Sequence, residues 1–167
     1  MHRRKSVHSC SARRVFRMCA GRGLRILFAR SRPMYRNLFA KRIVRDYFLE
    51  WEKVFNNYYG TPKLQVLNLL KKGKHVLLCI DVKGAEHISQ RFPQAIKIFI
   101  KPPSMAELRK RLKLRSSETH ESLNLRLKVA TQELKRAKEY DYIITNANLL
   151  KTIHTLETLV LSLLKKR

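Results

Sequence analysis

The sequence predicts an α/β fold in which a mostly parallel sheet is flanked by helices. Three short, continuous apolar runs carry this prediction, because such runs are typical of strands buried on both faces of a parallel sheet. Segments with helical periodicity separate the runs, as expected when a crossover helix follows each strand. The three expected strands are HVLLCIDV at 75–82, AIKIFI at 95–100 and YDYIIT at 140–145.

The first helix is expected just before the first of these strands. Thr61 and Pro62 are typical of an N-cap and a first helical residue, because a hydroxyl accepts from the first turn and proline has no N–H to lose there. Gly73 stands where glycine often ends a helix. The apolar face of this helix is expected to consist of Leu64, Leu67 and Leu70.

Three further helices are expected between and after the other strands. Ser104 and Glu107 have the spacing of a capping box, which predicts a helix that ends near Arg115. A charged, amphipathic helix is expected from about residue 122 to 138. Asn148 is a favourable cap for a last helix. The apolar face of that last helix consists of Leu149, Ile153, Leu156, Val160 and Leu163.

Charge divides the chain into two kinds of sequence. The whole chain has 37 Lys and Arg against 12 Asp and Glu, a formal net charge of +25. Residues 1–45 contain twelve Arg, two Lys and no acid, whereas all twelve acids follow from Asp46 onward. We therefore predict a boundary at residue 46, between an Arg-rich, atypical and disordered segment and a folded domain at 46–167.

Four explanations are open for residues 1–45. An acid-free, Arg-rich leader is typical of an organelle transit peptide. A basic arm would bind nucleic acid non-specifically and with salt-dependent affinity. The third explanation is a disordered, solvated tail. The fourth is an anomalous start, such as an out-of-frame or wrongly assigned stretch. The segment's short apolar run, Leu24–Ala29, is a candidate strand.

The cysteine pattern and the hydropathy of the sequence predict the cellular compartment of the protein. Cys10, Cys19 and Cys79 form no C-x-x-C pair and are odd in number, which favours a reducing compartment without a disulfide framework. No apolar run approaches the roughly 18 residues of a membrane span, and no secretory signal is visible. We predict a soluble, cytoplasmic protein with no membrane partner.

The stretch FLEWEKVFNNYYGT, at 48–61, combines acids, a tryptophan and further aromatic rings in fourteen residues. This composition indicates the wall of a pocket for a flat, polar ligand. Four other motifs follow it: VLLCIDVKGA, IFIKPPS…ELRKRL, R…RL…A…EL and YDYIITN. In this order and spacing, the five motifs resemble the guanylate kinase family over residues 47–164. The resemblance implies the parallel sheet of P-loop kinases and transfer of the γ-phosphoryl group from ATP to GMP.

The resemblance implies an acceptor site for GMP. The carboxylate of Glu50 would accept hydrogen bonds from guanine N1–H and N2–H₂, a donor pair that adenine lacks. Tyr59 would contact the GMP phosphate, and the hydroxyl of Thr61 would help to hold the base. Asp81 occupies an acidic position near the nucleotide and metal. Cys79 stands where many relatives have another acid, so that contact is expected to be lost.

The resemblance also implies residues that act on ATP. Arg115 and Arg126 match catalytic arginines of the mobile lid, where a guanidinium group suits phosphate oxygens. Asn146 matches an asparagine beside the ATP adenine, although Ala147 replaces the acid that often follows. Mg²⁺ is expected to accompany ATP, shared between the phosphates and few protein ligands.

Each candidate also has an ordinary structural explanation. Glu50 is otherwise a solvated surface acid, and Asp81 a cap for the next helix. Arg115 and Arg126 are otherwise members of a solvated basic face. Trp51 and Tyr58 are expected to fill the core. The histidines show no metal-ligand spacing, so no catalytic role is assigned to them.

The phosphate-binding motif G-x-x-x-x-G-K-[ST] does not occur in the 167 residues. We therefore expect the family's N-terminal strand and phosphate loop to be missing or replaced, and the strands at 75–82 and 95–100 to lose a neighbour. Phosphoryl transfer by this chain is expected to be severely reduced, because positioning of the donor phosphates carries much of the catalysis. The alternative is a non-catalytic guanylate-kinase-like module that binds GMP or a phosphorylated peptide.

Overall fold

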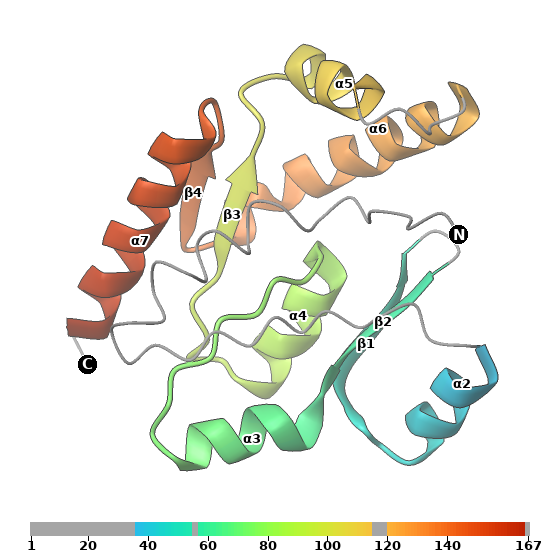
Figure 1. Cartoon of the computed structure of the whole chain (residues 1–167), viewed down its shortest axis with the longest axis vertical. Helices are drawn as coiled ribbons and strands as arrows, with labels where there is room; N and C mark the ends of the chain where they lie inside the picture. Colours follow the sequence, from blue (N-terminus) through green and yellow to red (C-terminus); the bar gives the residue numbers. More distant parts are fainter. Residues whose placement is uncertain (1–35, 55–56, 115–119, 166–167) are drawn as a thin grey trace, which may run out of the picture. The chain divides into compact units, whose positions relative to one another are not determined.

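The computed structural model describes residues 36–54, 57–114 and 120–165 (Figure 1). The described residues fall into two compact units, one that ends at Ala95 and one that begins at Ile96. Each unit contains a two-stranded sheet within the described ranges. The candidate strand Leu24–Ala29 and the candidate lid residue Arg115 lie outside the described residues.

In its described residues, the first unit contains a helix, a β-hairpin and two further helices. In chain order these elements are α2 (Arg36–Val44), β1 (Phe48–Val54), β2 (Asn57–Pro62), α3 (Lys63–Lys71) and α4 (Val82–Arg91).

One face of the hairpin is polar. Strands β1 and β2 pair antiparallel, with Glu50 opposite Thr61 and Glu52 opposite Tyr59. Side chains alternate between the two faces of a strand, so these four residues project from the same face. The hairpin therefore gathers two carboxylates and two hydroxyls on one surface.

The opposite face of the hairpin is aromatic and holds α2. Phe39 of α2 is 1% exposed, and its ring stacks on Phe48 with centroids 4.5 Å apart. Its centroid lies 5.1 Å from that of Tyr58 and 6.1 Å from that of Trp51. Trp51 stays 39% exposed, so it fills the core only in part. Because Phe39 anchors α2, the disorder predicted for residues 1–45 is wrong for 36–44.

Helix α3 begins later than the capping signal predicts. It starts at Lys63, and Pro62 occupies the N-cap position without a side-chain capping bond. Thr61 belongs to β2, and its hydroxyl donates to Glu50 instead of receiving the helix N–H. The predicted cap is therefore wrong because a cross-strand partner takes the hydroxyl. The predicted end is confirmed, since Gly73 follows the helix with φ +64°.

The core of the first unit contains Leu49, Val66 and Ile88. Helix α3 contributes Val66, whereas Leu64 is 68% and Leu70 is 41% exposed. The predicted leucine face of this helix is therefore wrong, because the helix turns Val66 toward β1 and α4. The partly buried residues around this core are Val76, Leu78, Ile80, Phe92 and Ala95.

The segment 75–82 does not form the predicted strand. Within this described segment only Val76 makes a β-bridge, and α4 begins at Val82. Val76, Leu78 and Ile80, three alternate residues of this segment, pack on the core. The apolar run thus reflects burial, while the ladder of hydrogen bonds that a strand needs is not formed along it.

The second unit carries the parallel pairing. Its strands are β3 (Ile98–Lys101) and β4 (Tyr142–Thr145), which pair in parallel from Ile98 opposite Tyr142 to Lys101 opposite Thr145. The predicted strands near 95–100 and 140–145 are therefore confirmed, with shorter bounds. The remaining elements are α5 (Met105–Lys113), α6 (His120–Lys135), a 3₁₀ helix (Arg136–Glu139) and α7 (Leu149–Lys165).

Helices α5 and α6 follow their sequence signals. The hydroxyl of Ser104 accepts from the N–H of Glu107 at 3.1 Å, which confirms the predicted cap of α5. The Glu107 carboxylate accepts from Arg111 Nε at 2.8 Å. The two helices pack through the buried residues Leu112, Leu123 and Leu127. Local caps and apolar periodicity thus account for these two helices.

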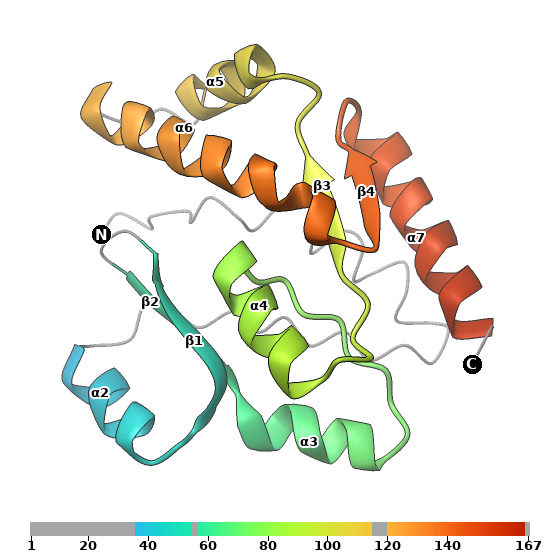
Figure 2. The ribbon, with the colours of Figure 1, turned by 180° about the vertical axis from the view of Figure 1, so that it is seen from behind.

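Helix α7 lies beside β4 (Figure 2). Asn148 Oδ1 accepts from the N–H of Lys151 at 3.1 Å, as the sequence predicts. Ile153 and Leu156 are buried on its inner face, whereas Leu150 is 68% exposed. In the part of the chain that the structure describes, no helix is both long and apolar enough to cross a membrane.

Candidate functional site

The candidate site lies on the polar face of the hairpin. Glu50 is 7% exposed and Thr61 is 1% exposed. The Thr61 hydroxyl donates to Oε1 of Glu50 from the opposite position on β2. Burying a carboxylate is costly unless hydrogen bonds compensate for lost water. Glu50 and Thr61 therefore form a buried, hydrogen-bonded polar pair within the first unit.

The start of α4 lies against the same carboxylate. Asp81 caps this helix, and its Oδ1 accepts from the N–H of Gly84 at 2.7 Å. A Cβ atom on Gly84 would lie 2.9 Å from Oε2 of Glu50, so the carboxylate reaches the first turn of α4. The capping role considered for Asp81 is confirmed. Its role near a nucleotide stays a prediction.

Burial raises the pKa of Glu50 above its ordinary value, because the charged form loses water. The hydrogen bond from Thr61 lowers this pKa in part. The negative charges of Asp81 and Glu52 raise it further, and His87 acts in the opposite direction. The charged form of Glu50 is thus under-stabilised by its surroundings, and a ligand that brings hydrogen-bond donors would supply what is lacking.

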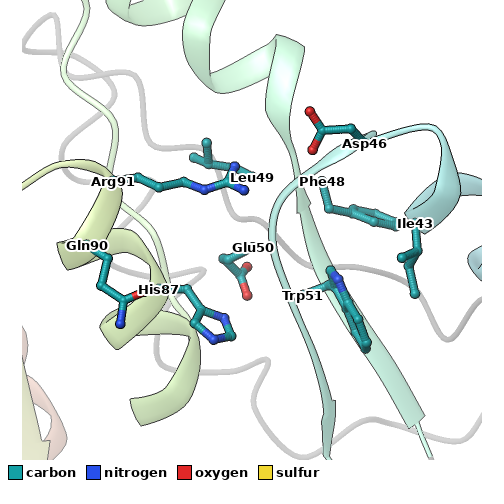
Figure 3. A pocket seen from close by; sticks show the side chains of 9 residues that line it. All are labelled: Ile43, Asp46, Phe48, Leu49, Glu50, Trp51, His87, Gln90 and Arg91. Atoms are coloured by element: carbon teal, nitrogen blue, oxygen red, sulfur yellow. The ribbon is translucent and has the colours of Figure 1, made fainter.

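A cavity of about 260 Å³ opens beside Glu50 (Figure 3). His87, Gln90 and Arg91 of α4 line one side, and Nδ1 of His87 lies 3.7 Å from Oε1 of Glu52. The complete lining consists of Ile43, Asp46, Phe48, Leu49, Glu50, Trp51, His87, Gln90 and Arg91. Sequence reasoning gave His87, Gln90 and Arg91 no role. Their i, i+3, i+4 spacing was the signal that they share a helix face.

The structure brings together three of the four residues predicted to bind GMP. Glu50, Thr61 and Asp81 meet around the start of α4. The fourth, Tyr59, projects from the same hairpin face two positions before Thr61, and it is half-buried. Tyr59 therefore lies further along the same surface as Glu50.

The residues predicted to act on ATP belong to the second unit. Arg126 lies on α6, and Asn146 follows β4 directly. Arg111 Nη1 donates to the carbonyl of Asn146 at 2.8 Å, and Arg111 Nη2 donates to that of Ala147 at 3.2 Å. Sequence reasoning missed Arg111, which fixes the loop that carries Asn146. Arg115 lies outside the described residues.

Asn146 is held by further contacts. Its N–H donates to the carbonyl of Lys101 at 2.7 Å. The hydroxyl of Thr152 lies 2.7 Å from the carbonyl oxygen of Asn148 and 3.3 Å from Oδ1 of Asn146, so the two oxygens share its one proton. These bonds connect the ends of both strands to the start of α7. In the described residues, no three His, Cys, Asp or Glu side chains gather as a possible metal-ligand set.

Comparisons with known proteins agree on one family. Residues 34–163 match the sequence model of the guanylate kinase family. A guanylate kinase of Caldanaerobacter subterraneus is 40% identical over 124 residues, which cover 74% of this chain and 60% of that protein. A guanylate kinase of Rickettsia bellii is 43% identical over 129 residues, 77% of this chain and 68% of that protein. The match includes α2, before the boundary predicted at residue 46.

A solved structure is similar in fold. The crystal structure of guanylate kinase from Anaplasma phagocytophilum aligns with a TM-score of 0.72 and 24% sequence identity. The alignment covers 91% of this chain and 79% of that one. The chain spans only 60% to 68% of the two curated relatives.

Proposed function

Because the chain belongs to the guanylate kinase family, we propose that its hairpin binds GMP as the acceptor of a phosphoryl group from ATP, giving GDP and ADP. The observation that carries this proposal is the buried Glu50 carboxylate, which the Thr61 hydroxyl holds in place. A carboxylate oxygen has more than one lone pair, so the bond from Thr61 leaves acceptor capacity for a ligand.

The chemistry of the base explains the preference for guanine. Guanine presents N1–H and N2–H₂ side by side, and the two oxygens of Glu50 accept from such a pair. Adenine has no such donor pair on that edge, so AMP would leave the buried carboxylate with the Thr61 hydroxyl but without donors from the base. Sites built to hydrogen-bond a substrate group discriminate strongly against analogues that lack it. The raised pKa of Glu50 supports this, because the charged form gains most from added donors.

The other acceptor residues have separate roles in the proposal. Tyr59 lies on the same hairpin face as Glu50, and its hydroxyl would bind the GMP phosphate. Asp81 caps α4 and would keep the first turn of that helix in place beside the base. Cys79, where relatives often carry an acid, would make no equivalent contact.

The donor side of the proposal rests on the second unit. Arg126 and Arg115 would neutralise charge on the transferring phosphoryl group, since a guanidinium fork matches phosphate oxygens. Asn146, whose backbone carbonyl accepts from Arg111, would contact the ATP adenine. Mg²⁺ would arrive with ATP and stay largely on the phosphates and water. A cytoplasmic location and non-specific nucleic-acid binding through residues 1–45 stay predictions from the sequence.

Calorimetry with the full chain tests acceptor binding. We expect GMP to bind and AMP to bind far more weakly. Glu50→Ala should weaken GMP binding by about tenfold to a hundredfold, as expected when a charged hydrogen-bonding group is lost. Lys83→Ala is the control, because Lys83 is an exposed residue of α4, and it should leave the preference for GMP over AMP unchanged. An unchanged preference in a well-folded Glu50→Ala sample would contradict the proposal.

A coupled assay for ADP release, with GMP and MgATP, tests turnover separately. The missing G-x-x-x-x-G-K-[ST] motif favours a slow reaction. GMP binding together with no GMP-dependent ADP release would favour the non-catalytic module. Turnover at the rate of an ordinary guanylate kinase would contradict the expectation of reduced activity.

A further inference from the structure

Gly84 is the third residue of α4, where glycine is unfavourable by intrinsic helix propensity. Its backbone is not in the left-handed region, in contrast to Gly73. Backbone conformation therefore does not require glycine at position 84. The requirement must come from the space around its Cα.

That space is filled on three sides. A Cβ atom on Gly84 would lie 2.9 Å from Oε2 of Glu50, 3.2 Å from Oδ1 of Asp81 and 3.3 Å from Cβ of Ile80. The shortest of these contacts involves the end of a flexible side chain. A methyl group at position 84 would therefore displace the Glu50 carboxylate most, and Asp81 and Ile80 would have to shift by a few tenths of an ångström.

The two oxygens of the Glu50 carboxylate have different neighbours. Thr61 donates to Oε1 from β2, and Gly84 sets the closest approach of Oε2 to α4. A carboxylate is planar and rigid, so a displacement of Oε2 also turns Oε1. We propose that Gly84 is a positioning residue for Glu50, and that the absence of a side chain there determines specificity for guanine. This inference rests on the proposed binding of GMP at the hairpin.

The expected effect of Gly84→Ala is selective. Hydrogen bonds weaken steeply with poor geometry, so a displaced carboxylate should lower GMP affinity by about tenfold. AMP makes no use of this carboxylate, so its weak binding should not change. The gain in helix propensity opposes the crowding, so the unfolding temperature should change little.

Gly73→Ala is the matched control. A Cβ atom there meets nothing within 4 Å, but φ of +64° is strained for alanine. This variant should lower the unfolding temperature and leave the affinity for GMP unchanged. The same chemical change at two glycines thus predicts opposite patterns of stability and binding.

The test uses the full chain and two independent measurements. The first is the carbon-13 resonance of the Glu50 side-chain carboxyl without nucleotide, assigned with Glu50→Gln. Gly84→Ala should shift this resonance and its titration midpoint, and Gly73→Ala should not. The second is calorimetry with GMP and with AMP.

A second pair of variants does not depend on nucleotide. In a Glu50→Ala background the nearest obstacle to the methyl group is absent, so Gly84→Ala should leave or raise the unfolding temperature. A methyl group that lowers this temperature equally in both backgrounds would overturn the inference.

The outcomes separate the inference from the proposed function. An unshifted Glu50 resonance in Gly84→Ala, or an equal loss of GMP and AMP affinity, would overturn the inference. If the wild type binds no GMP while the resonance still responds to Gly84→Ala, the proposed function is wrong, and the placement of Glu50 by Gly84 is retained.

Discussion

The two units of the molecule use their polar side chains differently. In the first unit, Thr61 bonds Glu50 across eleven positions of sequence, and both side chains are buried. Among the described residues of the second unit, polar side chains mostly bond within one helical turn, at exposed or half-buried positions. Examples of these local bonds are Ser104 with Glu107, Arg136 with Glu139 and Asn148 with Lys151. The exceptions include Arg111, which donates to the carbonyl of Asn146, and Asp141, which accepts from the N–H of Lys97.

This difference shows where the molecule places its chemistry. Local caps and ion pairs support helices and contribute modestly, because water competes for the same groups. A buried carboxylate needs a dedicated donor and raises the free energy of the unliganded fold. In the first unit, the buried Glu50 carboxylate raises the free energy of the unliganded fold. We propose that this carboxylate is buried there because it binds GMP.

The largest loss of stability is expected when Phe39 is replaced, because this residue joins α2 to the aromatic face of the hairpin. Phe39→Ala should destabilise the chain by about 3–5 kcal/mol, the usual cost of removing a buried phenylalanine ring. Urea unfolding followed by tryptophan fluorescence measures this, because Trp51 is the single tryptophan and its ring lies 6.1 Å from that of Phe39.

Leu38→Ala is the matched control on the same helix. Leu38 is 45% exposed, so its loss should cost less than about 1 kcal/mol. Equal effects of the two substitutions would mean that α2 does not pack on the hairpin, and that the folded part begins near residue 46 as the composition suggests.

An intermediate effect is expected from removing one hydroxyl in each unit. Thr61→Val should cost about 2–3 kcal/mol, because the buried Glu50 carboxylate is left without its donor. Ser104→Ala should cost about 1 kcal/mol, the usual value for a helix cap. Thermal and urea unfolding of both variants measures the difference between a buried bond and an exposed one.

Thr61→Ser is the control for the first of these substitutions. It keeps the hydroxyl and should retain most of the stability and the guanine preference. If Thr61→Val and Ser104→Ala cost the same, the contrast drawn between the two units would be lost.

The second unit was largely predictable from sequence. Ser104 and Asn148 cap helices as predicted, and the apolar runs near 95–100 and 140–145 form parallel strands. These signals are local, since each depends on residues a few positions apart. The first unit was less predictable, because Thr61 has a distant partner and the segment 75–82 has no ladder along it.

The candidate site was predicted in part, and only through resemblance to a family. Glu50, Thr61 and Asp81 do meet in the structure, but composition and spacing alone did not show that a carboxylate at position 50 would be buried. Gly84 and His87 were missed. Their importance depends on how closely α4 approaches β1, which is a tertiary distance that helical periodicity does not encode.

The smallest expected effect is a difference in pH dependence between two carboxylates. The pKa of Glu50 is raised by burial, whereas the pKa of Glu139 is lowered by its hydrogen bond with Arg136. The unfolded chain releases the Glu50 proton at the ordinary pKa of 4.5, whereas the native state keeps it to a higher pH. Between these two pKa values, the native state therefore binds more protons than the unfolded state. The stabilisation from protonated Glu50 is therefore full below pH 4.5 and is lost as pH rises through the raised native pKa.

Difference curves isolate each group from the other carboxylates. The free energy of unfolding of the wild type in urea, minus that of Glu50→Gln, should fall with increasing pH from pH 4 to 8. The same difference for Glu139→Gln, measured from pH 2 to 6, should rise with pH, because a lowered pKa gives stability that is present above the unfolded value of 4.5 and lost in acid. Curves of the same sign would mean that Glu50 is as well solvated as Glu139. In that case the buried carboxylate that distinguishes the first unit, and the cost that GMP is proposed to relieve, would not exist.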